Sequence, residues 1–285
     1  MNTKIQHTKI DAIYACVPEQ EILTTEYSLF SPDEARLFTK NTGIHARRVA
    51  ADHVTCSDLC YSAASQLLSD IGDASEIDLL VFVSQSPDYF LPATSIILQD
   101  RLGLRSDCMA FDINLGCSGY IYGLQVVGQF IQSGAVRNAL LLVGDKSTIS
   151  TAYQDKSTFP LFGDAGSATL IEFDSNAEDW HLDAGTDGSG ADSIIIPGGH
   201  SRNPYGTFDD SDFTIAPGLT RSLKHLHLNG MEVFNFALKN VPTSLKNVLN
   251  KVDLSLDEVD YCILHQANQL ITDSIRKKLK SSTEK

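Results

Sequence analysis

Short apolar runs bounded by polar residues recur along the chain and predict buried β-strands. They cover residues 79–83, 110–113 and 138–144, and each is followed by serine, asparagine, glycine or aspartate. Runs of this length between turn-forming residues are typical of core strands. Because helical segments alternate with them, the order predicts an α/β fold.

Two further segments have the spacing of helices. One is an apolar stripe at helical intervals, made up of Cys56, Cys60, Ala63, Ala64 and Leu67. The other covers residues 120–131, where apolar side chains occupy nearly every face. The second pattern predicts a helix buried all round rather than an amphipathic one, with Gly134 as its C-terminal stop.

An internal repeat links two distant parts of the chain. Residues 73–85 and 254–266 both read as an acidic turn, an aspartate, an apolar strand and a polar tip, with an amphipathic helix before and after. Such self-similarity predicts a fold built from two similar halves. We expect the halves to cover residues 1–175 and 176–285. The second lacks a counterpart to the strands and helix that follow the first copy, so we expect the natural protein to be longer.

Cys117 is the first candidate catalytic residue. It lies where an apolar strand breaks at glycine-flanked residues into the helix at 120–131. The free N–H groups and the positive end of a helix dipole favour a thiolate, and one such N–H can serve as an oxyanion donor. The alternative is a buried structural cysteine, which is common for free thiols.

His265 is the second candidate. The apolar run 259–264 ends at His265, and a helix through Leu270, Ile271, Ile275 and Leu279 is predicted after it. At a strand tip a histidine can project into a cleft and act as acid, base or hydrogen-bond donor. The alternative is a histidine that caps the following helix or is satisfied in the core.

A metal site is a weaker interpretation. His53, Cys56 and Cys60 lie at helical spacing, as metal ligands can. Both cysteines belong to the apolar stripe, however, so we expect them to pack in the core.

Composition and charge exclude several classes of protein. A net charge of -14 argues against a nucleic-acid partner. The 285 residues, 42% hydrophobic, can bury a sizeable core. No apolar run approaches a membrane span and the first ten residues are too polar for a signal peptide, so we expect a cytoplasmic protein. Six cysteines, mostly inside apolar patterns, suit reduced thiols better than disulfides.

Six motifs, in order along almost the whole chain, resemble the 3-oxoacyl-(acyl carrier protein) synthase III family. They are TGIHARRVA at 42–50, DINLGCSG at 112–119, SGAV at 133–136, FGDAG at 162–166, NGMEVF at 229–234 and HQAN at 265–268. The resemblance implies a thiolase-like fold with two similar halves, each a mixed five-stranded sheet with helices in αβαβα layers, the C-terminal half being incomplete in this chain. It also implies a homodimer.

The resemblance implies a catalytic triad of cysteine, histidine and asparagine. Cys117 matches the nucleophile and His265 the histidine. The triad asparagine belongs to a motif resembling Asn-Thr-Ser that would follow Lys285. Asn268 closes the HQAN motif and is a different residue.

The resemblance also implies binding residues for coenzyme A thioesters and an acyl carrier protein. The matching positions are Lys156 for phosphates, Gly230, Phe234 and Asn268 for the pantetheine tunnel, Leu91 for the partner subunit's acyl pocket, and Lys277 and Lys278 for carrier docking. Arg36 and Lys40 are further candidates for the phosphates. Leu37 and Asn41 stand where family members stack adenine between tryptophan and arginine, which predicts weaker or remodelled adenine binding. Leu270 replaces a frequent arginine on the docking helix.

Three hypotheses about function follow. The first is a decarboxylating condensation of an acyl primer with a malonyl thioester in lipid or polyketide biosynthesis, without a metal or redox cofactor. The second keeps Cys117 and His265 but transfers the acyl group to an amine, hydroxyl or other nucleophile. The third is a non-catalytic dimer partner or acyl-binding scaffold. In each, Asp112, Asp145 and Asp164 are expected to be structural.

Overall fold

A five-stranded mixed sheet forms the centre of the protein in a computed structural model, which describes residues 2–70 and 73–280. The strand order is β2-β8-β7-β5-β6. β2 and β7 run antiparallel to β8, whereas β7, β5 and β6 run parallel to one another. Because β5, β6 and β7 are parallel, their carboxyl ends lie at the same end of the sheet. The candidate nucleophile follows β6 there.

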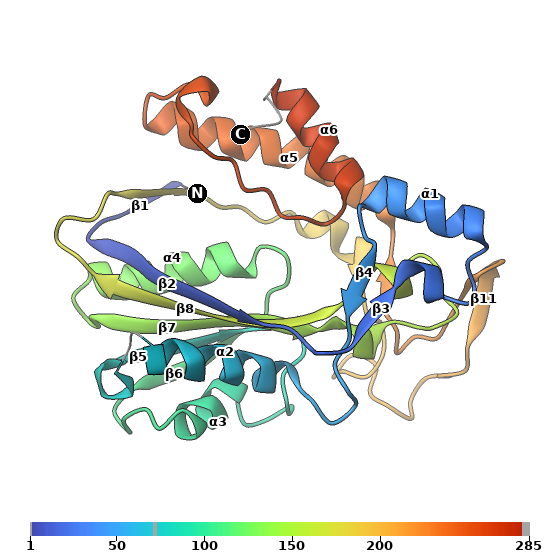
Figure 1. Cartoon of the computed structure of the whole chain (residues 1–285), viewed down its shortest axis with the longest axis horizontal. Coiled ribbons are helices and arrows are strands. Elements are labelled where there is room, and N and C mark those ends of the chain that lie inside the picture. Colours follow the sequence, from blue (N-terminus) through green and yellow to red (C-terminus); the bar gives the residue numbers. More distant parts are fainter. Residues whose placement is uncertain (1, 71–72, 281–285) are drawn as a thin grey trace.

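Helices cover both faces of this sheet, and further helices pack outside them (Figure 1). Their bounds are α1 Pro32–Thr42, α2 Cys56–Asp70, α3 Thr94–Arg101, α4 Gly119–Gln132, α5 Gly230–Lys251 and α6 Gln269–Leu279. The sheet strands are β2 Thr8–Cys16, β5 Leu79–Val83, β6 Met109–Ile113, β7 Asn138–Lys146 and β8 Asp164–Phe173. The shorter strands are β1 Asn2–Ile5, β3 Glu21–Leu23, β4 Ala46–Arg48, β9 Trp180–Asp183, β10 Ile194–Ile195, β11 Phe213–Ala216, β12 Leu219–Arg221 and β13 His227–Leu228.

Two hydrophobic clusters sandwich the sheet, and β5 contributes to both. Leu80 and Phe82 pack with the buried stripe of α2, while Leu79, Val81 and Val83 pack with α4. All five side chains of β5 are buried, because alternate residues of a strand point to opposite faces. The strand and the α2 stripe that the sequence predicts are confirmed.

α4 differs from its prediction. The helix forms, and Gly134 adopts φ +76° just after it as its stop. Only one face is buried, however, and Ile121 is 49% exposed. The prediction of all-round burial was wrong for the described residues, because the sheet covers one side while Tyr122 and Val126 on another line an open groove with residues 184–186.

The second copy of the repeat also differs. The helices α5 and α6 form as expected, but residues 259–264 are extended without ladder pairing. Tyr261 and Ile263 are 78% and 92% exposed. A strand needs a neighbour to share its backbone hydrogen bonds, and 259–264 has none among residues 2–70 and 73–280. The division of the chain at residue 175 falls between β8 and β9 and stays a prediction.

Candidate active site

Cys117 lies in a tight turn between β6 and α4. The turn begins where the Leu115 N–H donates to the Ile113 carbonyl at 3.2 Å and closes where the Gly119 N–H donates to the Gly116 carbonyl at 2.7 Å. Glycine is needed at position 119, because a Cβ there would lie 2.6 Å from Cγ1 of Val83. The short turn and the close packing against β5 hold Cys117 just before the first turn of α4.

The Cys117 thiol and the His265 imidazole lie close enough to affect each other's pKa. This contact is the main factor that lowers the pKa of Cys117 and raises the pKa of His265. The thiol's own backbone N–H favours the thiolate as well. Both side chains are reachable from solvent, so the pair is an accessible nucleophile with a proton donor beside it.

His265 reaches Cys117 from an extended segment rather than from a paired strand. Residues 252–268 connect α5 to α6, and His265 lies near the end of this connection (Figure 1). Asn268 caps α6 by accepting the Ile271 N–H at 2.8 Å, which fixes the end of the segment. The structure brings His265 and Cys117 together although the predicted strand does not form, and their catalytic roles stay a prediction.

Asp145 lies at the end of β7, against residues 84–86, which follow β5. Its Oδ1 accepts hydrogen bonds from the Gln85 N–H at 2.7 Å and from the Ser84 and Ser86 hydroxyls at 2.9 and 3.2 Å. Burial raises the pKa of this carboxyl, and its charge opposes formation of the Cys117 thiolate. Asp145 therefore holds the tip of β5 and also acts electrostatically on the site.

Lys156 is paired with Glu34. The ammonium lies 2.8 Å from the carboxylate, and this contact is the main cause that lowers the pKa of Glu34 to about 2. The Lys156 backbone N–H donates to the Gly218 carbonyl. Arg36, the other candidate phosphate ligand, forms an exposed pair with Asp33 at 3.0 Å. A phosphate that binds Lys156 must compete with Glu34.

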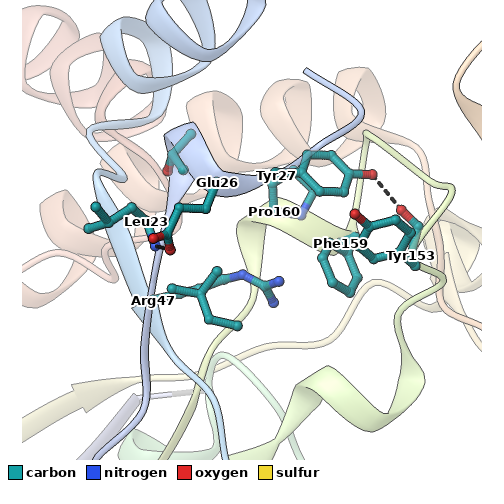
Figure 2. A pocket seen from close by; sticks show the side chains of 9 residues that line it. Leu23, Glu26, Tyr27, Arg47, Tyr153, Phe159 and Pro160 are labelled. Carbon is teal, nitrogen blue, oxygen red and sulfur yellow. Dashed lines mark hydrogen bonds between the residues drawn. The ribbon is translucent and has the colours of Figure 1, made fainter. Parts of the chain in front are cut away.

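An aromatic cavity of about 220 Å³ lies beside the segment that carries Lys156 (Figure 2). Tyr27 donates its hydroxyl to the Tyr153 carbonyl at 2.5 Å, and the Arg47 guanidinium stacks 4.1 Å from the Phe159 ring centre. Arg47 also donates to the Phe162 carbonyl. Neither Cys117 nor His265 lines this cavity, so it supports the loop around Lys156 rather than the reacting atoms.

The remaining predicted binding residues are spread over several elements. Gly230 opens α5 with free space where a Cβ would stand, and Phe234 is half-buried one turn later. Leu91 is 76% exposed. Lys277 is exposed, whereas the Lys278 ammonium donates to the Leu238 carbonyl at 2.7 Å. The structure brings together Cys117 and His265 and does not test the binding roles of the others.

Two of the three carboxylates have the expected structural roles. Asp112 accepts the Thr94 and Ser95 N–H groups at the start of α3. Asp164 accepts the Ala50 and Thr148 N–H groups. Among residues 2–70 and 73–280, no group of three or more His, Cys, Asp or Glu side chains could hold a metal ion.

A sequence model of 3-oxoacyl-(acyl carrier protein) synthase III matches residues 111–188, which include Cys117. The chain is 35% identical over 280 residues to the β-ketoacyl-(acyl carrier protein) synthase III of Levilactobacillus brevis, covering 98% of this chain and 83% of that protein. The Chlamydia caviae protein of the same name is 32% identical over 286 residues, covering 99% and 82%. The chain belongs to the 3-oxoacyl-(acyl carrier protein) synthase III family.

Solved structures of 3-oxoacyl-(acyl carrier protein) synthases agree with this family and with its thiolase-like fold. The crystal structure of a 3-oxoacyl-(acyl carrier protein) synthase from Burkholderia xenovorans has a TM-score of 0.92 at 36% identity, covering 100% of this chain and 80% of that one. The synthase III of Pseudomonas aeruginosa has a TM-score of 0.82 at 26% identity, covering 97% and 81%.

Sequence reasoning missed several residues of this synthase III site. Glu34 was not recognised as the partner of Lys156, and Gln85 was treated only as the polar end of a strand. Asp145 was expected to be structural only, yet its charge also acts on Cys117. The repeat offered a signal, because Gln85 in the first copy corresponds to Gln266 beside His265 in the second.

Proposed function

We propose that this protein is an acyltransferase that condenses an acyl-coenzyme A primer with a malonyl group on an acyl carrier protein, in fatty acid or related lipid biosynthesis. The observation that carries the proposal is the pairing of Cys117 with His265, in which the pKa of the thiol is lowered and the pKa of the imidazole is raised. Such a pair supplies a thiolate and a proton donor without any cofactor.

In the first half-reaction the Cys117 thiolate attacks the thioester carbonyl of the primer. The Cys117 N–H, just before α4, stabilises the oxyanion. As the tetrahedral intermediate collapses, the sulfur–carbon bond to coenzyme A breaks, and the leaving thiolate takes the proton of the His265 imidazolium. The primer is then an acyl-Cys117 thioester.

In the second half-reaction a malonyl thioester loses CO2. The carbon–carbon bond breaks, its electron pair forms an enolate, and His265 stabilises the enolate oxygen by donating a hydrogen bond. The enolate carbon attacks the acyl-Cys117 carbonyl. The Cys117 thiolate then leaves with its electron pair, which regenerates the nucleophile and releases a 3-oxoacyl product. A proton taken up from water restores the imidazolium of His265.

Substrate binding is proposed for the residues around this pair. Lys156 and Arg36 would bind coenzyme A phosphates, and Gly230, Phe234 and Asn268 would line the pantetheine channel. The free space at Gly230 supports this role. For the carrier protein we propose Lys277 and Lys278 on α6, where the exposed Lys277 is available for an acidic partner.

A homodimer is proposed on two features of the first half. β6 is an edge strand of the five-stranded sheet, and a second copy can pair with such an edge. Tyr89, Phe90 and Leu91 are 62%, 76% and 76% exposed, and a partner subunit would cover them.

A cytoplasmic location is proposed with the soluble substrates. No helix among residues 2–70 and 73–280 could span a membrane.

Release of labelled CO2 tests the condensation. The acylated protein is mixed with carboxyl-labelled malonyl-coenzyme A or malonyl carrier protein, and CO2 and 3-oxoacyl product are measured together. We expect both from the wild type, and a much larger loss of CO2 release than of self-acylation in His265→Ala. Discharge of the acyl group to an amine or hydroxyl acceptor with no CO2 would instead identify a simple acyltransferase. No acyl adduct at all would leave a binding scaffold.

A further inference from the structure

We propose that Asp145 is a positioning residue for Cys117. It fixes the tip of β5 against the nucleophile turn, and its negative charge moderates the reactivity of the thiol. The inference builds on the proposed function in one respect only, that Cys117 is the nucleophile. Its measurements are made on the thiol itself.

The tip of β5 is held at three points by one carboxylate oxygen. Asp145 Oδ1 accepts the Ser84 hydroxyl, the Gln85 N–H and the Ser86 hydroxyl. The Ser86 hydroxyl also accepts the Lys146 N–H at 2.8 Å, which joins the tip to β7 a second time. Three converging donors fix the backbone direction of residues 84–86.

This fixed tip touches the nucleophile turn in two places. The Ser84 N–H donates to the Ile113 carbonyl at 3.2 Å, and the same carbonyl accepts the Leu115 N–H. The Gln85 side chain lies against Gly116, where a Cβ would collide with Gln85 Oε1. Asp145 therefore acts on Ile113 and Gly116 through residues 84–86, without contacting the turn itself.

The negative charge of Asp145 is not neutralised by a neighbouring cation in the part of the chain that the structure describes. No ion pair joins it to a cation among the described residues. The ammonium of neighbouring Lys146 is turned to the carbonyls of Ala51, Asp52 and Val54. The negative charge of Asp145 opposes the thiolate forms of Cys60 and Cys117, and on Cys117 its effect is smaller than that of His265. Asp145 therefore raises the pKa of the Cys117 thiol, whereas His265 lowers it.

Asp145→Asn separates charge from geometry. The amide oxygen can still accept the three hydrogen bonds, but the negative charge is gone. We expect iodoacetamide to alkylate Cys117 about two- to fivefold faster at pH values below the thiol pKa, followed by peptide mass analysis of the full chain. Asp164→Asn is the matched control, since Asp164 also accepts three donors, but from Ala50 and Thr148.

Gln85→Ala tests whether residues 84–86 position the nucleophile turn. Gln85 is exposed, so its replacement leaves the core intact. We expect acylation of Cys117 by an acyl thioester to slow about threefold, while the pH midpoint of alkylation stays unchanged. Equal alkylation rates for wild type and Asp145→Asn, with unchanged acylation in Gln85→Ala, would overturn the inference. A wild-type Cys117 that takes no acyl group would refute the proposed function instead, and the alkylation comparison would still decide the role of Asp145.

Discussion

The Cys117 thiol lies beside the imidazole of His265, a residue far along the chain from it, and each shifts the pKa of the other. The two residues stabilise each other's charged form, because a thiolate favours an adjacent imidazolium and the reverse. The turn before α4 supplies one partner, and the segment before α6 supplies the other.

The first prediction concerns the pH dependence of Cys117. The pKa of the thiol is lowered, so its thiolate is already formed at pH values where an ordinary cysteine is protonated. In His265→Ala the main stabilising contact is lost, and the midpoint of alkylation against pH should move upward. Cys16 and Cys262, which are half-buried, serve as internal controls and should keep their rates. An unchanged midpoint would show that the helix terminus alone sets the thiol pKa.

The second prediction concerns Gly116. An added Cβ would collide with Gln85 Oε1, so Gly116→Ala must displace that side chain or shift the turn. We expect Gly116→Ala to slow acylation of Cys117 about tenfold, and Gln85→Ala to make the glycine replaceable. The double variant should therefore acylate at the rate of Gln85→Ala alone. Rates that multiply in the double variant would show that the two residues act independently.

The third prediction concerns Glu34. Its carboxylate forms an ion pair with the Lys156 ammonium. The low pKa of Glu34, about 2, keeps the carboxylate charged and paired down to strongly acidic pH. Glu34→Gln should lower the KM for an acyl-coenzyme A primer about two- to fivefold at low salt, because Lys156 becomes available to phosphate. The gain should vanish in Glu34→Gln with Lys156→Ala. A KM that does not respond to Glu34→Gln would argue against phosphate binding at Lys156.

The fourth prediction concerns the stability of a buried ion pair. Asp155 is fully buried, and its Oδ2 accepts from Arg221 Nη1 at 3.0 Å, joining the loop after β7 to β12. Asp155→Ala should lower the free energy of unfolding by about 3–5 kcal/mol, because it leaves a buried guanidinium unpaired. Asp155→Leu combined with Arg221→Met should cost much less. Urea unfolding of the three proteins measures this, and equal losses would mean that packing rather than charge matters.

The sequence determined the local elements because their signals are local. The apolar run 79–83 became a strand buried on both faces, and the stripe from Cys56 to Leu67 became the buried face of α2. A cysteine between a strand and a helix start marked Cys117 as a candidate nucleophile, and a polar tip after an apolar run marked His265 as a candidate partner; their catalytic roles stay predictions.

The tertiary structure decided which side chains share a charge or a surface. Residues 259–264 have the sequence of a strand but pair with no strand in the part of the chain that the structure describes, because a ladder depends on a neighbouring strand and not on the run itself. The pairing of Lys156 with Glu34 and the grip of Asp145 on residues 84–86 join segments far apart in the chain. Periodicity reports which face of an element is buried, whereas contacts between elements depend on how those faces meet in space.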